Sequence, residues 1–340
     1  MEKYAICRSI LAGYQTPLYF CSILNMRIRL PFNAPKRILL GLAVAALCSE
    51  VPQKAGADFS NKVTLAETSD RGPAMAYLGS VFIAWKGMGN NQLNLASSTD
   101  GRNFGSKYTS GEMSFDAPAL CVHNNTLYIA WTGTDSLLNV AVINLQGTRV
   151  SGFSDKVTLS EMSRQSPALA SVNGRLYIGW RGDGNDNLNV ASSGDNGKTF
   201  GNKYTSNEAS KDAPVLCSHN NGLFIAWKGV GNLQLNVASM SLSGPNVTGL
   251  NTVTLGETSP DRPALVSFDG KLFLAWRGNG SLNLSLSSSA DNGRTFRSKF
   301  VSAESSLLPP ALSPFGRVLL FGWTGVQNWQ LNVAQAAESR

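Results

Sequence analysis

A glutamate recurs at one place in a repeated sequence pattern, and each copy could act as an acid, a base or a ligand for sugar hydroxyls. Each is followed two residues later by a serine, and the six are Glu67, Glu112, Glu161, Glu208, Glu257 and Glu304. A glycosidase needs two carboxylates in different environments, so that one donates a proton while the other stays ionised. Copying one carboxylate into every repeat instead favours a structural bond to a backbone N–H or a neighbouring Lys/Arg, or a repeated sugar pocket.

An aromatic residue, an amide and a cation accompany these glutamates. The tryptophans end apolar runs such as LYIAW, and they are Trp85, Trp131, Trp180, Trp227, Trp276 and Trp323. An asparagine follows leucine at Asn94, Asn139, Asn189, Asn236, Asn283 and Asn332. The residue after the tryptophan is Lys86, Arg181, Lys228 or Arg277, with Thr132 and Thr324 in the other two repeats. The alternation favours indoles packed between sheets, whereas an aromatic platform beside amides and carboxylates would also suit a sugar ring.

Three arginines occur only in alternate repeats and are the candidates for an anion site. They are Arg71, Arg164 and Arg262, and each lies one to three residues before a proline. Around one channel mouth they could grip a carboxylate or sulfate through charge-assisted hydrogen bonds. Asp70 and Asp261 lie next to two of them, so solvated ion pairs are the alternative.

The spacing of the tryptophans defines the elements that must position these residues. Successive tryptophans are 46, 49, 47, 49 and 47 residues apart, a period typical of solenoids, propellers or arrays. Each repeat contains four short runs rich in β-branched and aromatic residues, separated by Gly, Asn, Asp or Ser. We therefore predict an all-β, six-bladed β-propeller with four-stranded antiparallel blades.

The two ends of the repeat array complement each other. The last repeat stops after its third run, at 331–334, while the segment DFSNKVTLAETS at 58–69 is similar to GFSDKVTLSEMS at 152–163. An N-terminal strand that completes the last blade explains both ends. It would close the ring and remove exposed sheet edges.

The first 57 residues read as a leader. From Met26 a basic segment precedes the apolar run ILLGLAVAAL and a small-residue site ending at Ala57, which is the order of a secretory signal. We predict an over-extended start at 1–25, a signal peptide at 26–57 and the propeller at 58–340. Export to the periplasm or the extracellular space, with cleavage near Ala57, is expected.

The charge, cysteine and histidine content limits the kinds of partner, cross-link and metal site to expect. Residues 1–57 contribute +5 of the formal charge of +7, so the rest is near neutral and does not favour nucleic-acid or anionic-membrane binding. Cys121 and Cys217 occupy matching places, which predicts two buried thiols and no disulfide. Cys48 resembles a lipoprotein box only loosely. His123 and His219 have no carboxylate or cysteine cluster at ligand spacing, so no metal and no cofactor are expected.

Two short boxes resemble a known family. SGDNGKTF at 193–200 and SADNGRTF at 289–296, with the shortened STDGRNF at 98–104, are similar to the Asp-box (BNR repeat) of sialidase-like β-propellers. The resemblance implies structural hairpins in which Asp100, Asp195 and Asp291 bond local backbone. For a sialidase it also implies three arginines, a Tyr nucleophile activated by a Glu, and an Asp acid/base. No R-I-P sequence and no unique Tyr or Asp matches that set in the mature chain, so the resemblance assigns no catalytic residue. If the protein is a glycosidase, the three alternate-repeat arginines are the candidates.

Three functions follow as hypotheses. The first is an exported, lectin-like protein that binds glycans or glycoconjugates at repeated inter-blade sites without catalysis. The second is a sialidase-like exo-glycosidase with one site at the channel mouth. The third is a scaffold for protein partners. None of them requires nucleic acid or an integral membrane segment in the mature chain.

Overall fold

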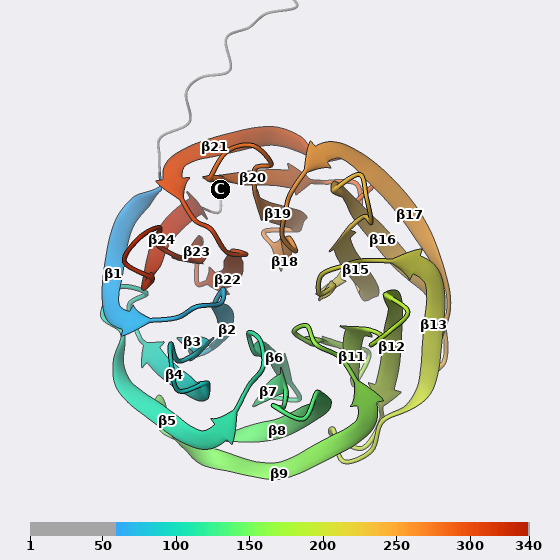
Figure 1. Ribbon diagram of the computed structural model, residues 1–340, viewed down its shortest axis with the longest axis horizontal. Helices are drawn as coiled ribbons and strands as arrows, with labels where there is room; N and C mark the ends of the chain where they lie inside the picture. Colours follow the sequence, from blue (N-terminus) through green and yellow to red (C-terminus); the bar gives the residue numbers. More distant parts are fainter. Residues whose placement is uncertain (1–58, 339–340) are drawn as a thin grey trace, which may run out of the picture. The chain divides into compact units, whose positions relative to one another are not determined.

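The computed structural model describes residues 59–338, which form six four-stranded antiparallel sheets arranged as propeller blades (Figure 1). The predicted fold is confirmed. The predicted leader lies outside the described residues. Within 59–338 no helix has the length and apolarity needed to cross a membrane.

We number the blades along the chain and give each from its inner to its outer strand. Blades 1 and 2 hold β2 (Ala74–Leu78), β3 (Ser80–Lys86), β4 (Gln92–Ser98), β5 (Gly105–Met113) and β6 (Ala119–His123), β7 (Thr126–Thr132), β8 (Leu137–Gln146), β9 (Arg149–Met162). Blades 3 and 4 hold β10 (Ala168–Val172), β11 (Arg175–Arg181), β12 (Asn187–Ser193), β13 (Gly201–Ala209) and β14 (Val215–His219), β15 (Gly222–Lys228), β16 (Gln234–Ser243), β17 (Asn246–Thr258). Blades 5 and 6 hold β18 (Ala264–Phe268), β19 (Lys271–Arg277), β20 (Asn283–Ser289), β21 (Arg297–Ser305) and β22 (Ala311–Phe315), β23 (Val318–Thr324), β24 (Gln330–Glu338), β1 (Ser60–Thr68).

The ring closes through its first strand. β1 pairs antiparallel with β24, so that Val63 lies opposite Val333 and Thr64 opposite Asn332. Blade 6 is therefore built from both ends of the described chain, as the matching end sequences predict.

The core lies between neighbouring blades. Second strands are the best buried, and every residue of β3 is buried. Apolar side chains of adjacent blades share clusters: Tyr177 and Leu188 of blade 3 pack with Ile225 and Trp227 of blade 4. Because this surface is removed from water only when two blades meet, inter-blade burial is the main term that holds the ring together.

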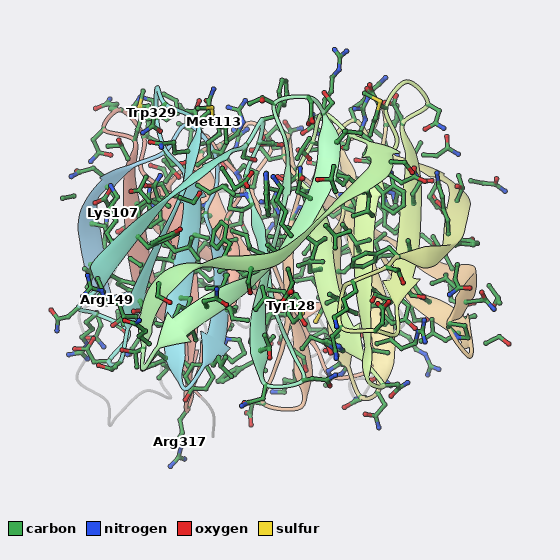
Figure 2. The ribbon with its side chains drawn as sticks, turned by 90° about the horizontal axis from the view of Figure 1, so that it is seen from below. Lys107, Met113, Tyr128, Arg149, Arg317 and Trp329 are labelled. Atoms are coloured by element: carbon green, nitrogen blue, oxygen red, sulfur yellow. The ribbon has the colours of Figure 1, made fainter. Side chains whose placement is uncertain are left out.

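The blade connections alternate between two faces of the ring. The hairpin face carries the turns from first to second strands and the Asp-box turns from third to fourth strands. The loop face carries the turns from second to third strands and the links from one blade to the next. Figure 2 shows Met113 and Trp329 at the loop face and Arg317 at the hairpin face. At the hairpin face, Asn173 and Gly174 join β10 to β11 with φ of 50° and 70°, as a type I′ turn requires.

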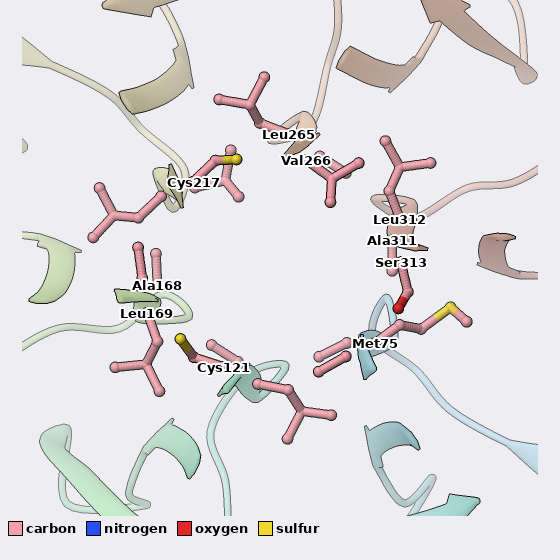
Figure 3. Close-up of a pocket in the computed structure, with 18 of the residues that line it drawn as sticks. Met75, Cys121, Ala168, Leu169, Cys217, Leu265, Val266, Ala311, Leu312 and Ser313 are labelled. Atoms are coloured by element: carbon pink, nitrogen blue, oxygen red, sulfur yellow. The ribbon is translucent and has the colours of Figure 1, made fainter. Parts of the chain in front are cut away.

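A central channel runs between the six inner strands. It encloses about 350 Å³ and is lined mainly by apolar side chains such as Met75, Leu169 and Leu265 (Figure 3). Cys121 and Cys217 also line it, and both are free thiols. Burial raises the pKa of each thiol to about 12. At neutral pH these sulfurs are therefore protonated.

Candidate functional site

The six tryptophans are packed inside the ring. Each is only 1% exposed. Their indoles present no open face to solvent, so the aromatic sugar platform that the sequence allowed has no surface on which to form. The alternative interpretation, packing between sheets, matches this burial.

The repeated glutamates bind lysines in five of the six blades. Lys107 Nζ lies 2.5 Å from Glu67 Oε2 and 5.7 Å from the ring centroid of Trp85. The lysine and the tryptophan belong to one blade, and the glutamate to the outer strand of the preceding blade. We call this arrangement the Lys–Glu–Trp stack, and its other copies are Lys156–Glu112–Trp131, Lys203–Glu161–Trp180, Lys299–Glu257–Trp276 and Lys62–Glu304–Trp323.

A β-bulge aims each of these lysines. Ser106, directly before Lys107, has a φ of 51°, and the strand register shifts at this point. The matching residues before the other lysines are Asn61, Asp155, Asn202 and Ser298, all with positive φ. Blade 4 is one residue shorter here, and its register runs without a shift from Val237–Val253 to Met240–Leu250. Thr252 takes the place of the lysine and donates a hydrogen bond of 3.2 Å to Glu208.

The repeated asparagines are bonded within their own sheets. Asn94 Nδ2 donates to the Gln92 carbonyl at 2.9 Å, and its Oδ1 accepts from Thr109 Oγ1 at 2.7 Å. The same two bonds, to the residue two before and to a threonine of the outer strand, are made by Asn139, Asn189, Asn236 and Asn332. Both ends of these amides are occupied by the scaffold.

Asn283 is not equivalent to these asparagines, so the repeat position predicted for it is wrong. Ser285 lies opposite Trp276, as Asn94 lies opposite Trp85. Asn283 sits two residues earlier, where its Nδ2 donates to the Ser302 carbonyl at 2.9 Å. The Leu-Asn pair that suggested equivalence is thus out of register in blade 5.

The residues that follow the tryptophans bond to turns and blade connections of the loop face. Lys86, with a 4% exposed side chain, contacts both carboxylate oxygens of Asp70 at 2.7 and 2.8 Å. Arg277 Nε lies 2.5 Å from Asp261 Oδ2. The remaining pairs are Arg181 with Asp186, Lys228 with the Pro260 carbonyl, Thr132 with the Gln165 carbonyl and Thr324 with the Arg71 carbonyl. These cations are therefore scaffold groups.

The three alternate-repeat arginines lie on one basin at the loop face. The basin holds about 280 Å³, and Arg71, Arg164 and Arg262 all line it. Lys211 and Lys228 add two further cations, while its carboxylates come from Asp116, Asp212 and Asp261. Five cations against three carboxylates leave the basin with a positive balance. It lies at the mouth of the channel, since Arg262 lines both.

The three arginines differ in how far their guanidinium groups are already engaged in ion pairs and hydrogen bonds. Arg71 Nε lies 2.9 Å from Asp116 Oδ1. Arg164 is 65% exposed and reaches Asp183 only at 3.6 Å. The backbone N–H of Arg262 donates to Asp212 at 2.7 Å, and its guanidinium has no hydrogen bond or ion pair within residues 59–338. Arg164 and Arg262 are thus open to an anion.

Two carboxylates of the basin were missed by the sequence interpretation. Asp116 accepts from the Ala117 N–H at 2.8 Å and, across the blade boundary, from the Ser166 N–H at 3.0 Å. Asp212 makes the matching bonds in blade 4. The signal was the D-A-P sequence at 116–118 and 212–214, which occurs only in these two blades. These carboxylates hold the loops from which the arginines project.

The tyrosine and the glutamate that the sialidase resemblance implies are not among the described residues of the basin. No tyrosine or glutamate is among its described lining residues. Within 59–338, no group of three or more His, Cys, Asp or Glu side chains could hold a metal ion. Among its described residues, the basin has the groups to bind an anion but not the Tyr–Glu pair.

The Asp-box aspartates bond their own turns. Asp195 accepts from Ser193 Oγ at 2.7 Å, from the Thr199 N–H at 3.0 Å and from Thr199 Oγ1 at 2.6 Å. Asp291 repeats these contacts, and Asp100 makes a shortened version. Hydrogen bonds to the ionised form hold the pKa of all three carboxyls well below the usual range.

Comparison with solved structures finds proteins that include sialidases and a lectin. The Hadza microbial sialidase Hz136 is 14% identical, with a TM-score of 0.58 over 78% of this chain and 65% of that one. A mutant Trypanosoma rangeli sialidase displaying trans-sialidase activity is 13% identical, with a TM-score of 0.56 over 82% of this chain and 60% of that one. The SapL1 lectin, in complex with alpha methyl fucoside, is 13% identical, with a TM-score of 0.52 over 76% of this chain and 89% of that one.

The likeness is one of fold. This chain spans less than two thirds of the length of either sialidase. No family model matches the sequence, and no curated protein matches it.

Proposed function

We propose that the protein binds a glycan through the loop-face basin and holds a negatively charged sugar with its arginines. The observation that carries the proposal is that Arg71, Arg164 and Arg262 come from three blades yet line one basin. Planar guanidinium groups suit carboxylates and sulfates because they donate two parallel hydrogen bonds. The fold likeness to sialidases and to a lectin supports a carbohydrate as the ligand class.

One site per chain is favoured over six repeated sites. The repeated glutamates, asparagines and tryptophans are bonded or buried within the scaffold. The sialidase-like alternative rests on the same arginines, but the described lining of the basin lacks the Tyr–Glu pair that this resemblance implies. The protein-scaffold alternative is supported by Phe115, which is 43% exposed and lines the basin.

Calorimetric titration with N-acetylneuraminic acid and with its methyl ester tests the proposal. We expect the acid to bind at the basin and the uncharged ester not to bind there. Arg262→Ala should weaken binding about tenfold or more, because a charge-assisted contact is lost. Arg317→Ala, at the hairpin face, is the matched control and should bind normally.

Three other outcomes would count against the proposal. Several equivalent sites per chain would favour repeated pockets. Equal binding of acid and ester would remove the role of the arginines. Release of the fluorophore from a fluorogenic sialoside, abolished by Arg164→Ala, would favour the hydrolase.

We also propose that the protein is exported, on the basis of its basic, apolar and small-residue leader. N-terminal sequencing of the protein purified from its source should begin at Asp58. A chain that retains Met26 or Met1 would contradict this.

A further inference from the structure

A groove lies between blades 4 and 5, away from the channel and the basin. It holds about 700 Å³ and lies between β17 and the Asp-box turn that joins β20 to β21. We call it the blade 4–5 groove. It is close in size to the pockets that hold small ligands, which run from roughly 300 to 1,000 Å³.

The matching junction between blades 2 and 3 shows what the groove has lost. There, Tyr128 Oη donates to the Asn196 carbonyl of the facing Asp-box at 3.0 Å. Phe224 replaces this tyrosine in blade 4, so the hydroxyl bridge to the next blade is absent. Val142, which packs in the apolar cluster of blades 2 and 3, is replaced by Ser239.

Two further replacements remove volume from the same wall. Thr126 of blade 2 corresponds to Gly222, where a Cβ would come within 3.2 Å of the Phe224 ring. Lys156 and its bulge correspond to Thr252, in a strand that is one residue shorter. All four differences reduce side-chain bulk around one groove, while the surrounding scaffold of His219, Ser267 and Asn292 repeats that of His123, Ser171 and Asn196.

The lining that results is polar at its rim and apolar at its floor. Phe224 and Val237 form the buried floor with His219, whose Nδ1 lies 2.8 Å from Ser267 Oγ. Hydroxyl and amide groups stand above them, from Ser239, Thr252, Asn220, Asn251 and Asn292. No carboxylate is among the described lining residues.

One cation completes the rim. Arg294 of the Asp-box is exposed, and its guanidinium has no hydrogen bond or ion pair within residues 59–338. Its counterpart at the filled junction is Lys198. An apolar floor beneath amides and hydroxyls suits a sugar ring and its hydroxyls, and an arginine whose guanidinium forms no ion pair within residues 59–338 suits a negative charge.

We propose that the blade 4–5 groove binds one anionic, hexose-sized sugar unit, with its hydroxyls at the polar rim and its acid group at Arg294. This site is separate from the loop-face basin, shares no lining residue with it, and does not depend on it. The protein then carries two unlike saccharide sites.

Calorimetric titration with glucuronic acid and with glucose tests the groove, because the two sugars differ only at C6, which is a carboxylate in the first and a hydroxymethyl group in the second. We expect one glucuronate per groove, measured in Arg262→Ala so that the contribution of the basin is reduced. The double variant Phe224→Tyr/Ser239→Val, which restores the side chains of blade 2, should abolish this binding. Arg294→Ala should weaken it about tenfold.

Matched controls separate the groove from general effects. Lys198→Ala removes the corresponding cation at the filled junction and should leave binding unchanged. The double variant introduces only residues that the fold already accommodates in blade 2, and its melting temperature checks folding. Unchanged glucuronate binding in this variant, no binding in Arg262→Ala, or glucose binding as tightly as glucuronate would overturn the inference. Loss of sialic-acid binding in Arg262→Ala alone leaves it standing.

Discussion

At the residue scale, Lys107 and its four counterparts each combine two interactions that are modest alone. An exposed ion pair contributes up to about 1 kcal/mol, and a cation–π contact at an exposed site about 0.5–1 kcal/mol. In the Lys–Glu–Trp stack the ammonium group meets the tryptophan of its own blade and the glutamate of the preceding one. A single side chain therefore links two blades.

We predict that Lys156→Ala lowers the free energy of unfolding by about 1 kcal/mol, because both contacts disappear together. Urea denaturation measures the loss. Thr252→Ala, at the blade that has no lysine, is the control and should stay within about 0.5 kcal/mol of the parent protein. Equal losses in the two variants would argue against a cation–π contribution.

Burial of the two histidines predicts that the free energy of unfolding depends on pH. Burial lowers the pKa of His123 and His219 below the ordinary value of 6.5. Between the folded and unfolded pKa values the unfolded chain binds more protons, so stability rises with pH. We expect the free energy of unfolding to be level above about pH 7 and to fall as the pH drops below about 6.5.

Urea titrations from pH 5 to 8 test this, with His123→Gln/His219→Gln as the variant that should flatten the slope. The Asp-box aspartates do not interfere, because lowered pKa values confine the loss of their contribution to pH below their ordinary value of 3.8. An unchanged slope in the double variant would exclude the imidazoles as its source.

Sequence reasoning left structural pairing open for the glutamates but did not identify the partner. Glu67 and Lys107 are 40 residues apart, in adjacent repeats. Only the lateral packing of outer strands brings them together, and a repeat alignment gives no direct view of that packing. The burial of the tryptophans, in contrast, was readable from the alternation of LYIAW.

At the element scale, one inserted residue decides what an outer strand can do. The bulges turn a lysine toward the preceding blade, whereas β17 has no register shift at the matching place, Thr252. The same geometry explains the misassignment of Asn283, since a Leu-Asn pair in the sequence does not reveal the register of β20 against β19.

We predict that inserting an aspartate after Asn251 and changing Thr252 to lysine builds a sixth stack onto Glu208 and Trp227. Stability should increase by about 1 kcal/mol in urea denaturation. Thr252→Lys without the insertion should gain little, because the strand without a bulge does not aim the ammonium group. An equal gain from both variants would contradict the role of the bulge.

At the scale of the whole molecule, closure depends on β1. Its Leu65 is buried against blades 6 and 1, and its pairing leaves β24 with a partner on each side. Without it, β24 would be an open sheet edge.

Removal of the chain through Thr68 should therefore lower the melting temperature and cause association, measured by calorimetry and light scattering. A circular permutant that links residue 338 to residue 59 and opens the exposed turn at Gly147 is the control. It should melt near the parent protein, because all pairs are kept. A truncated chain that stays monomeric with an unchanged melting temperature would contradict closure by β1.

The architecture could be predicted because the tryptophan spacing and matching end sequences encode it. The basin could not be predicted fully. Its arginines stand at different distances from their prolines, so the loop conformation decides whether their side chains meet. Asp116 and Asp212 set that conformation through bonds to the next blade, which a single repeat does not reveal.

The two thiols that line the channel can report how often the blades of the ring separate. Cys121 and Cys217 line the channel from blades 2 and 4 and pack between the blades, and burial raises their pKa, which keeps them unreactive. Their rate of alkylation therefore reports how often the blades part. A reagent too wide for the closed channel should react only at the frequency of that breathing motion, which the truncated chain should accelerate.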